Sequence, residues 1–242
     1  MVAYLLFTPT IQKTRTPPIM HRMVFIWFII ALMTLVGCTS TTPDQRDPQK
    51  VEGSRCCQRV EATSHRAAIV RTAARLVGAN TIEVNGRRIV YDCAGVTRAI
   101  YLKHGIDLYE GVSSGKRANG VRLIFANVRR YGTLHQGPVV PLGDLVFFDN
   151  TWDFNGDGLL NDPLTHVGVV EQVESDGTVV FISRVAGAIE RYRMNLALPH
   201  VHQTTDGHVL NDYIRRKRPD DPKEAGHLTG ELFAFYGTRL DR

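Results

Sequence analysis

The spacing of the apolar residues changes once along this chain, near residue 141. Before that point apolar residues recur every three to four positions, which is the period of an amphipathic helix. The pattern predicts three helices, from about 61 to 77, from 92 to about 104 and from about 117 to 130. An Asn-Gly pair between two β-rich arms predicts a hairpin between the first and second helices.

Beyond residue 141 the apolar residues come in short, β-rich runs. Four of these runs predict strands: "DLVFFDN", "HVGVVEQVE", "TVVFIS" and "IERYRMN". A further strand is predicted over 208–214, and "LTGELFAFYGTRL" near the end of the chain predicts a short packed helix. Helices followed by strands indicate an α+β fold in which N-terminal helices pack on an antiparallel β-sheet.

Residues 1–37 have a different pattern, with one apolar run from Met23 to Val36 after the basic Arg22. The run is too short for a typical transmembrane helix, which takes about 20 residues, and it suits the apolar region of a signal peptide. It leads into Leu-Val-Gly-Cys, which resembles the lipobox of bacterial lipoproteins. A signal peptide followed by a chance cysteine is the alternative.

The lipobox resemblance divides the chain into three parts. It implies that residues 1–37 are removed as a signal peptide, and that a lipid on Cys38 anchors the protein to a membrane. Residues 38–60 are rich in Thr, Pro, Asp and Gln and indicate a flexible tether, which leaves 61–242 as the folded domain. In Gram-negative lipoproteins the lack of an Asp after the lipidated Cys goes with delivery to the outer membrane. The predicted location is therefore the outer membrane, facing the periplasm.

The charge of the mature chain argues against a nucleic-acid partner. The full chain carries 29 Lys and Arg against 24 Asp and Glu, a formal charge of +5. The predicted signal peptide contains Lys13, Arg15 and Arg22 and no acidic residue, so the mature protein would be nearly neutral. We therefore expect no nucleic-acid binding.

One cysteine, Cys93, lies inside the predicted folded domain. Cys56 and Cys57 are adjacent in the tether and lack the spacing of metal ligands, so no role is assigned to them. Cys93 follows Asp92, the predicted cap of the second helix, where free backbone N–H groups and the helix dipole stabilise a thiolate. The backbone N–H of Cys93 would also help to hold an oxyanion. A buried, unreactive thiol is the alternative.

A cysteine nucleophile needs a base, and His166 is the histidine that the architecture offers. It begins the predicted strand "HVGVVEQV" in the sheet half of the domain. The other histidines lie in the leader, on predicted helices or in polar loops, where a solvated surface position is expected. His200 and His202 form a short pair, but no third residue has the spacing of a metal ligand.

Three stretches together resemble a known family. "YDCAGVTRAIYLKHGIDL", "PLGDLVFF" and "THVGVVEQVESDGTVVFI" are similar to three blocks of the NlpC-type cell-wall cysteine peptidases, a papain-like group. The resemblance implies a papain-like fold and hydrolysis of an amide or peptide bond in peptidoglycan stem peptides, with no cofactor required for the chemistry. It implies that Cys93 is the nucleophile, His166 the base and Ser183 the third catalytic residue. Tyr91 and Asp92 would contact the substrate.

The resemblance covers about residues 62–195 and departs from the family at two positions. Ala94 stands where Ser is common. Together with Gly95 it leaves room for a substrate chain, but it removes a contact to a substrate amine, so a preference for γ-D-glutamyl–diaminopimelate bonds does not follow. Ser183 stands where His, Asn or Gln is usual and is a weaker orienter of an imidazole. A water, Arg184 or a backbone carbonyl are alternatives for that role.

A loop between the first two predicted strands has the pattern of a calcium-binding loop. The stretch "DFNGDGLLND", residues 153–162, places oxygen ligands at alternating positions with a Gly at the sixth, as in the first half of an EF-hand loop. The predicted ligands are the side chains of Asp153, Asn155, Asp157 and Asn161 or Asp162, and the carbonyl of Leu159. Leu164 replaces the Glu of position twelve, which excludes a paired EF-hand sensor. We expect a structural Ca²⁺ that stiffens this insertion near His166; a polar surface turn is the alternative.

Three other functions stay open at this point. A CHAP-type amidase would use the same cysteine and histidine on a different bond. A non-catalytic cell-wall-binding lipoprotein would have a degenerate papain-like fold. An acyltransferase or transglutaminase-like enzyme would transfer the acyl group to an acceptor other than water. The expected partners are a peptidoglycan peptide and, through the lipid, a membrane; the sequence identifies no regulatory protein.

Overall fold

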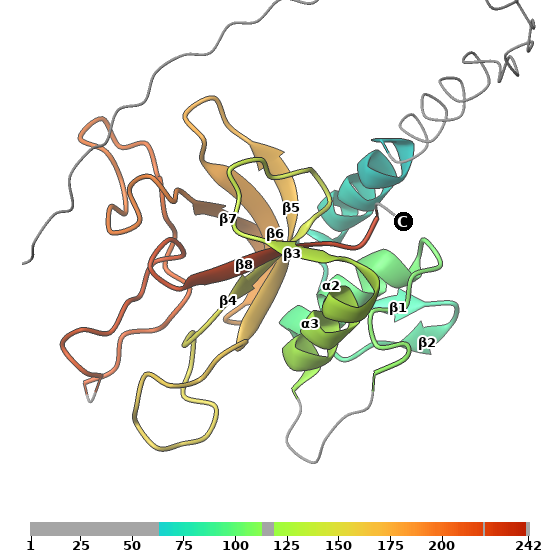
Figure 1. Ribbon diagram of the computed structural model, residues 1–242, viewed down its shortest axis with the longest axis horizontal. Helices are drawn as coiled ribbons and strands as arrows, with labels where there is room; N and C mark the ends of the chain where they lie inside the picture. Colours follow the sequence, from blue (N-terminus) through green and yellow to red (C-terminus); the bar gives the residue numbers. More distant parts are fainter. Residues whose placement is uncertain (1–62, 113–118, 220, 241–242) are drawn as a thin grey trace, which may run out of the picture. The chain divides into compact units, whose positions relative to one another are not determined.

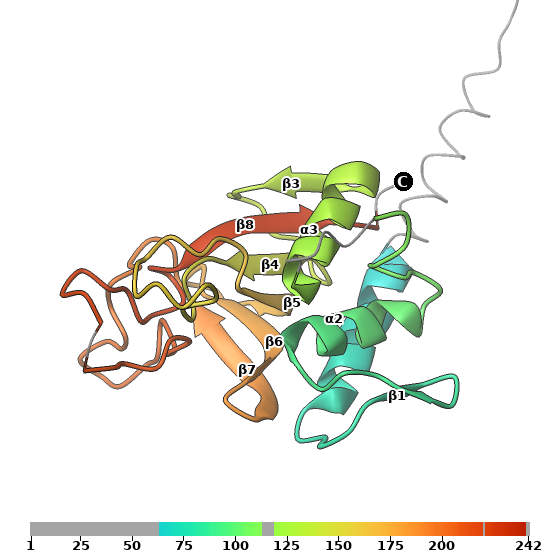
Figure 2. The same ribbon diagram turned by 90° about the horizontal axis from the view of Figure 1, so that it is seen from below.

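The computed structural model describes residues 63–112, 119–219 and 221–240. They form a mixed α+β fold, in which helices pack on one face of a six-stranded antiparallel sheet (Figure 1; a second view is given in Figure 2). The predicted α+β class is therefore confirmed. The predicted signal peptide, Cys38 and the tether lie outside the described residues. Within the described part, no helix is both long enough and apolar enough to span a bilayer.

The three helices lie close to where the sequence predicts them. The first helix covers 63–76 of the described residues. α2 covers Cys93–Leu102 and α3 covers Gly120–Tyr131. The side chains of Asp92 and Asn119 cap α2 and α3, each by accepting a backbone N–H from the first turn. α3 thus begins later than predicted, because Asn119 forms its cap.

The predicted hairpin is present between the first helix and α2. β1 covers Glu83–Val84 and β2 covers Arg87–Arg88, and the two strands pair antiparallel. The turn residues Asn85 and Gly86 have φ angles of 52° and 74°. Asn and Gly tolerate this left-handed conformation better than other residues, which is why the pair marks the turn.

The sheet has the strand order β3-β8-β4-β5-β6-β7, and all neighbouring strands are antiparallel. The bounds of the strands are Thr133–His135 for β3, Leu145–Phe148 for β4, His166–Val173 for β5, Val179–Val185 for β6, Ala188–Met194 for β7 and Phe233–Thr238 for β8. The four runs predicted as strands after residue 141 are therefore confirmed as β4 to β7. β3 is an additional strand that the spacing of apolar residues does not reveal.

The stretch predicted as a short helix near the end of the chain contains β8, so this prediction is wrong. β8 lies inside the sheet, between β3 and β4. Its aromatic side chains pack on both faces of the sheet. Phe235 contacts Phe125 of α3, with ring centroids 5.8 Å apart, while Tyr236 belongs to the core on the opposite face. Packing on two faces requires the alternation of side chains that a strand provides.

The predicted strand over 208–214 is also wrong. This stretch forms only isolated bridges, such as the one between Tyr213 and Leu228. Its backbone groups bond to neighbouring loops instead: the N–H of Leu210 donates to the carbonyl of His202 at 2.8 Å. The stretch therefore belongs to the irregular segment between β7 and β8, which covers the face of the sheet opposite the helices.

The sheet is buried on both faces. On one face Leu145 and Phe147 of β4 pack with the helices. On the other face Val146 and Phe148 pack under the segment between β7 and β8. This two-sided burial explains why the "LVFF" run of β4 is buried at every position and shows no polar alternation.

A buried aspartate joins the first helix to the sheet. Asp144, from the block "PLGDLVFF", has no exposed surface. Its oxygens lie 2.6 Å from Arg66 of the first helix, 3.1 Å from His135 of β3 and 2.5 Å from the hydroxyl of Thr238 on β8. A buried carboxylate is stable only with such partners. Asp144 therefore fixes the start of β4, and with it the sheet against which α2 packs.

Candidate active site

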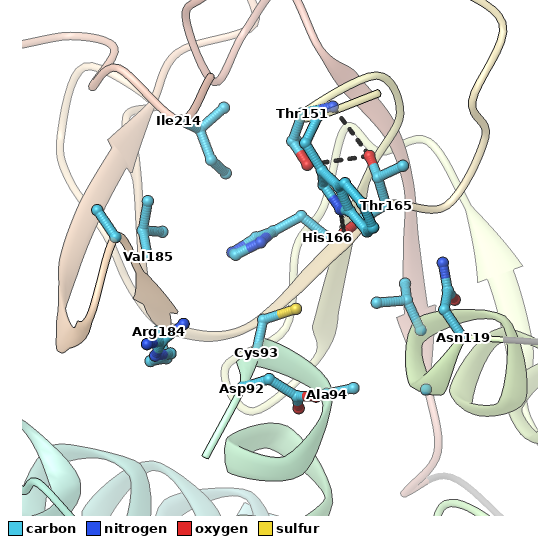
Figure 3. A pocket seen from close by; sticks show the side chains of 14 residues that line it. Asp92, Cys93, Ala94, Asn119, Thr151, Thr165, His166, Arg184, Val185 and Ile214 are labelled. Atoms are coloured by element: carbon cyan, nitrogen blue, oxygen red, sulfur yellow. Dashed lines mark hydrogen bonds between the residues drawn. The ribbon is translucent and has the colours of Figure 1, made fainter. Parts of the chain in front are cut away.

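Cys93 and His166 line one cavity of about 320 Å³ (Figure 3). Cys93 is the first residue of α2, and His166 is the first residue of β5. α2 packs against β5, so these two element starts meet. The structure thus brings together the two residues that the sequence singles out as nucleophile and base.

Asp92 fixes the start of α2 and hence the place of the Cys93 side chain. Its Oδ1 accepts the N–H of Gly95 at 2.7 Å. The backbone groups of Val167, Ala94 and Cys93 act on the thiol of Cys93 in the direction that lowers its pKa. Free N–H groups at a helix start stabilise negative charge, whether on the sulfur or on a nearby oxyanion.

Gly95 is required by the packing of the helix start and does not line the cavity. A Cβ atom at this position would lie 1.9 Å from the carbonyl oxygen of Val90, so only glycine lets the helix start lie against the preceding chain. The prediction that Gly95 leaves room for a substrate is therefore wrong. Ala94 does line the cavity, and a Cβ atom on Gly120 would lie 2.6 Å from its methyl group. Small residues at both positions allow α2 and α3 to start side by side.

A hydrogen-bond relay orients the imidazole of His166. Its Nε2 lies 2.8 Å from the hydroxyl oxygen of Ser183, and this hydroxyl donates to the carbonyl of Val167 at 2.7 Å. Because a serine hydroxyl has a single hydrogen, Ser183 accepts from the Nε2–H of His166. In the neutral ring Nδ1 is then the unprotonated nitrogen, which is free to accept a proton.

Ser183 is the described residue whose side chain hydrogen-bonds His166, and the carbonyl of Val167 accepts the hydrogen of its hydroxyl. Arg184 forms no hydrogen bond with His166 among the described contacts. The catalytic role of Ser183 stays a prediction. The hydroxyl of Ser183 is short, but it reaches the ring because β5 and β6 are neighbours in the sheet. Ser183 has no exposed surface and lies behind the ring, not in the cavity wall.

Burial keeps both Cys93 and His166 neutral at pH 7. Burial, together with the charge of Asp92, raises the pKa of the Cys93 thiol to about 11. Burial, together with the charge of Arg184, lowers the pKa of His166 to about 3. The thiolate expected from the helix start is therefore not the resting form, because desolvation outweighs the backbone N–H groups. The pair is a thiol beside a neutral imidazole.

The loop between β4 and β5 forms one wall of the cavity. The N–H and the hydroxyl of Thr151 both donate to the hydroxyl oxygen of Thr165, at 2.9 Å each. Trp152 lies next to them and is half exposed. Besides this loop and the start of α2, the described lining comes from three other places in the chain: Asn119, Gly120 and Val121, then Arg184, Val185 and Ala186, and finally Ile214. These residues belong to no motif, so only the folded structure assigns them to the cavity.

The two predicted substrate-binding residues occupy different places. Asp92 lines the cavity. Tyr91 lies outside it, in a neighbouring groove that includes Val90. The hydroxyl of Tyr91 donates to the carbonyl of Ala79 at 2.6 Å, and its ring lies 5.1 Å from the Arg184 guanidinium carbon. In this structure Tyr91 supports Arg184.

Most of the predicted calcium ligands face one another at the tip of the loop between β4 and β5. The Oδ2 of Asp157 accepts from the side-chain amides of Asn155 at 3.0 Å and Asn161 at 2.9 Å. Asp153 accepts two backbone N–H groups of the loop, at 2.7 and 3.0 Å. Asp162 is separate from this group, because it is buried at the base of the loop.

The loop is held by its own hydrogen bonds. The N–H of Leu159, the residue predicted to bind calcium through its carbonyl, donates to Asp157 at 2.8 Å. Hydrogen bonds from Asn161 and the backbone of Leu159 lower the pKa of Asp157, which keeps the carboxylate ionised. Carboxylate and amide oxygens are the ligands that Ca²⁺ prefers. Calcium binding by this loop stays a prediction.

A second polar cluster lies outside the cavity. The Nε2 of His208 lies 3.2 Å from Asp176 and 3.5 Å from Glu174. Glu174 also pairs with Arg193 at 3.5 Å. All these side chains are partly exposed, and ion pairing accounts for their arrangement without a metal. Glu174 and Asp176 are two residues apart, but Arg193 and His208 lie much further along the chain, so no spacing pattern indicates the whole cluster.

Comparisons with protein-family models, with curated proteins and with solved structures found no match for this chain. The resemblance to the NlpC-type peptidases therefore depends on the three sequence blocks alone.

Proposed function

We propose that this protein is a cysteine hydrolase that cleaves an amide or peptide bond in peptidoglycan stem peptides, on a papain-like fold of the NlpC type. The relay from the Val167 carbonyl through Ser183 to His166 carries this proposal. It leaves the unprotonated Nδ1 of His166 in a ring that shares a cavity with the Cys93 sulfur. A nucleophile, a base and a group that orients the base are the parts that acyl transfer needs.

In the proposed reaction, Nδ1 of His166 accepts the thiol proton as the Cys93 sulfur attacks the carbonyl carbon of the scissile amide. The backbone N–H of Cys93 donates to the oxyanion that forms. His166 then gives the proton to the leaving amine, the C–N bond breaks, and a thioester remains on Cys93. Water attacks this thioester with His166 again as the base, which releases the acid and restores the thiol.

The neutral resting pair sets the timing of the proton transfer. Because the pKa of Cys93 is raised and that of His166 is lowered, the proton moves during the attack and not before it. The imidazolium that forms is buried, so its Nε2–H needs a partner. Ser183 supplies that partner and thereby lowers the cost of charging the ring.

The choice of peptidoglycan follows from the three sequence blocks and from the predicted export. A lipid on Cys38 would hold the domain at the outer membrane, where it faces the cell wall. Stable membrane attachment by lipid requires more than one acyl chain, which is what lipobox processing supplies in the resembling lipoproteins. The chemistry requires no cofactor, and the nearly neutral mature chain offers no basis for a nucleic-acid partner.

Mass spectrometry of muropeptides tests the proposal. Isolated peptidoglycan is incubated with the purified protein, with Cys93→Ala, and with Cys57→Ala as a control that removes a thiol of the tether. We expect new, shorter stem peptides with the wild type and with Cys57→Ala, and none with Cys93→Ala. Identical muropeptide profiles for the wild type and Cys93→Ala would overturn the hydrolase proposal.

A non-catalytic wall-binding lipoprotein is the second candidate, and the raised pKa of Cys93 is the observation that favours it. A thiol with a pKa of about 11 is almost entirely protonated at pH 7 and reacts slowly unless a base assists it. For this function, Cys93→Ala would bind isolated peptidoglycan as tightly as the wild type, and neither protein would change the muropeptides. Co-sedimentation with peptidoglycan measures the binding.

A further inference from the structure

Arg184 is a charged side chain that lines the cavity. It has no role in the proposed reaction. It follows Ser183 on β6 and lines the cavity with Cys93 and His166. Figure 3 shows Arg184 and Asn119 on opposite sides of Cys93. Arg184 therefore lies where a substrate group next to the scissile bond would be placed.

The guanidinium of Arg184 lacks a hydrogen-bond or ion-pair partner among the described residues. No hydrogen bond or ion pair joins it to that part of the chain, and its Nε is buried without a hydrogen-bond acceptor. Two other arginines, by contrast, form ion pairs: Arg98 with Asp107 at 2.7 Å, and Arg215 with Asp221 at 2.6 Å. A buried donor without an acceptor costs stability, so an acceptor supplied by a ligand would be favourable.

The side chain is nevertheless held in place. Its guanidinium carbon lies 5.1 Å from the centre of the Tyr91 ring, and Tyr91 is itself fixed by its hydrogen bond to the carbonyl of Ala79. Stacking on an aromatic ring attracts a cation but does not neutralise it. Arg184 is thus pre-positioned with its charge available, which reduces the entropy lost when a ligand binds.

Among the described residues that line the cavity, Arg184 is the only formal cation. The same described lining contains one formal anion, Asp92, whose Oδ1 accepts the N–H of Gly95 at the start of α2. The remaining lining residues are neutral at pH 7, including His166 with its lowered pKa. A ligand with one negative charge would therefore meet its complement at Arg184.

We propose that Arg184 binds a carboxylate of the substrate, so that the protein acts on acidic peptides with a free carboxylate beside the scissile amide. A guanidinium and a carboxylate match in geometry and can form two parallel hydrogen bonds. This inference rests on the proposed hydrolase function and names its substrate class.

Binding of a carboxylate at Arg184 would also act on His166. The positive charge of Arg184 is one of the two causes that lower the pKa of His166, after burial. A bound carboxylate would offset this charge and make the imidazole a stronger base. An acidic substrate would then raise kcat as well as lower KM, whereas a contact that only holds the substrate would act on KM alone.

Matched substrates test the inference. Two peptides are compared that share the scissile amide, one with a free carboxylate beside it and one with a carboxamide at the same place. For the wild type we expect kcat/KM to be about ten- to a hundredfold higher for the acid, the range typical of a hydrogen bond to a charged group. Arg184→Gln should lose this preference, and Arg184→Lys should keep part of it.

Arg191→Gln is the matched control. Arg191 lies on the neighbouring strand β7, is partly exposed and pairs with Glu171 at 2.6 Å, outside the lining of the cavity. We expect this variant to keep the preference of the wild type for the acid. If Arg184→Gln keeps the preference as well, or if the wild type shows none, the carboxylate site is overturned.

Binding to Cys93→Ala separates this inference from the proposed function. Calorimetry measures the Kd of both peptides for Cys93→Ala and for Cys93→Ala combined with Arg184→Gln. Turnover without preference for the acid would overturn the carboxylate site and leave the hydrolase function standing. Preferential binding that depends on Arg184, without turnover by the wild type, would overturn the hydrolase function and leave the site standing. Neither binding nor turnover would overturn both.

Discussion

Ser183 shows how one small side chain can orient a histidine. Its hydroxyl donates to the Val167 carbonyl and accepts from His166, so both of its hydrogen bonds have a fixed direction. The direction of the first bond determines which nitrogen of His166 carries the proton. A longer Asn or His at this position would carry more hydrogen-bonding atoms, but here the backbone of β5 supplies the second contact.

Replacement of Ser183 by Ala removes this relay. We expect kcat to fall at least about tenfold, because a free imidazole loses the orientation on which general-base catalysis, about 10²–10⁴-fold in total, depends. We expect the free energy of unfolding to fall by about 1–3 kcal/mol, because buried polar groups lose their partners. Kinetics and urea unfolding measure the two effects.

Thr229→Ala is the control for this prediction. Thr229 has no exposed surface, and its hydroxyl donates to the carbonyl of Arg193 at 2.6 Å, outside the cavity lining. The control should lose similar stability and keep its kcat. A fall in kcat of equal size in both variants would mean that Ser183 acts only through stability.

At the residue scale, the sequence alone predicts that Cys93 and His166 belong to one site, because each begins an element and lies in a recognisable sequence block. It does not identify Ile214 or Trp152, which reach the cavity from irregular segments. It also does not predict that the Cys93 thiol and the His166 imidazole are both neutral. The helix start, which favours a thiolate, is a local feature, whereas the burial that outweighs it depends on the whole fold. The pairing of Ser183 with His166 is foreseen by resemblance, but the carbonyl that directs the hydroxyl is seen only in the structure.

The start of α2 combines a structural and an electrostatic effect in Asp92. Its side chain caps the helix, and its charge raises the pKa of Cys93. Asp92→Asn keeps a cap oxygen and removes the charge, whereas Asp92→Ala removes both. The two variants therefore separate the effects.

We expect Asp92→Asn to lower the pKa of Cys93, so that iodoacetamide reacts faster than with the wild type at the same alkaline pH. Its stability should be nearly that of the wild type, while Asp92→Ala should lose about 0.5–2 kcal/mol. Alkylation rates between pH 7 and 11, in a background with Cys56→Ala and Cys57→Ala, and thermal unfolding check this. An unchanged pH dependence in Asp92→Asn would contradict the assigned role of the charge.

The loop between β4 and β5 gives a second prediction at the scale of a structural element. If its oxygens bind Ca²⁺, adding the ion after chelation should raise the melting temperature, because a ligand that binds only the folded state stabilises it. Asp157→Asn, at the centre of the group, should remove the response. Asp206→Asn, at an exposed turn with a carboxylate bonded to Thr204, is the control and should keep it. Equal melting temperatures of the wild type with calcium and with chelator would sink the prediction.

Elements that depend on local signals are the ones the sequence predicts. The cap Asp92, the turn at Asn85 and Gly86 and the helical period are all read within a few residues. β8 could not be predicted from local signals, because the Leu, Glu and Ala residues in and around it favour a helix. Its strand form results from pairing with β3 and β4, which lie far away in the sequence.

At the scale of the whole molecule, the buried neutral His166 makes stability depend on pH. Its pKa is about 3 in the folded protein and about 6.5 in the unfolded chain. Below pH 6.5 the unfolded chain therefore binds a proton that the folded protein does not, and stability is lost as the pH falls toward 3. At about 1.4 kcal/mol per pH unit, this amounts to about 2 kcal/mol at pH 5.

Urea unfolding at pH 7 and pH 5 measures this loss. We expect the wild type to lose about 2 kcal/mol more between these pH values than His166→Gln, which has no imidazole to protonate. His200→Gln is the control, because the side chain of His200 is 79% exposed, and it should behave like the wild type. Equal losses in the wild type and His166→Gln would show that other groups cause the acid sensitivity.

The class of the fold could be predicted because the order of helices and strands is visible in the apolar pattern. The order of strands in the sheet could not, since it depends on long-range contacts such as those of Asp144. That residue joins the first helix, β3, β4 and β8 through Arg66, His135 and Thr238. Within the sequence it is only one polar residue before a buried run.

The position of β8 also has a consequence for the time before the fold is complete. β4, β5, β6 and β7 pair in sequence order, so these strands can form hairpins from short stretches of chain early in folding. β3 pairs only with β8, through contacts such as Thr133 with Thr238, and has to wait for a loop of most of the domain to close. Until then one edge of β4 presents unpaired backbone groups to other chains. We therefore expect the risk of aggregation to be greatest while the domain folds and to fall when β8 enters the sheet.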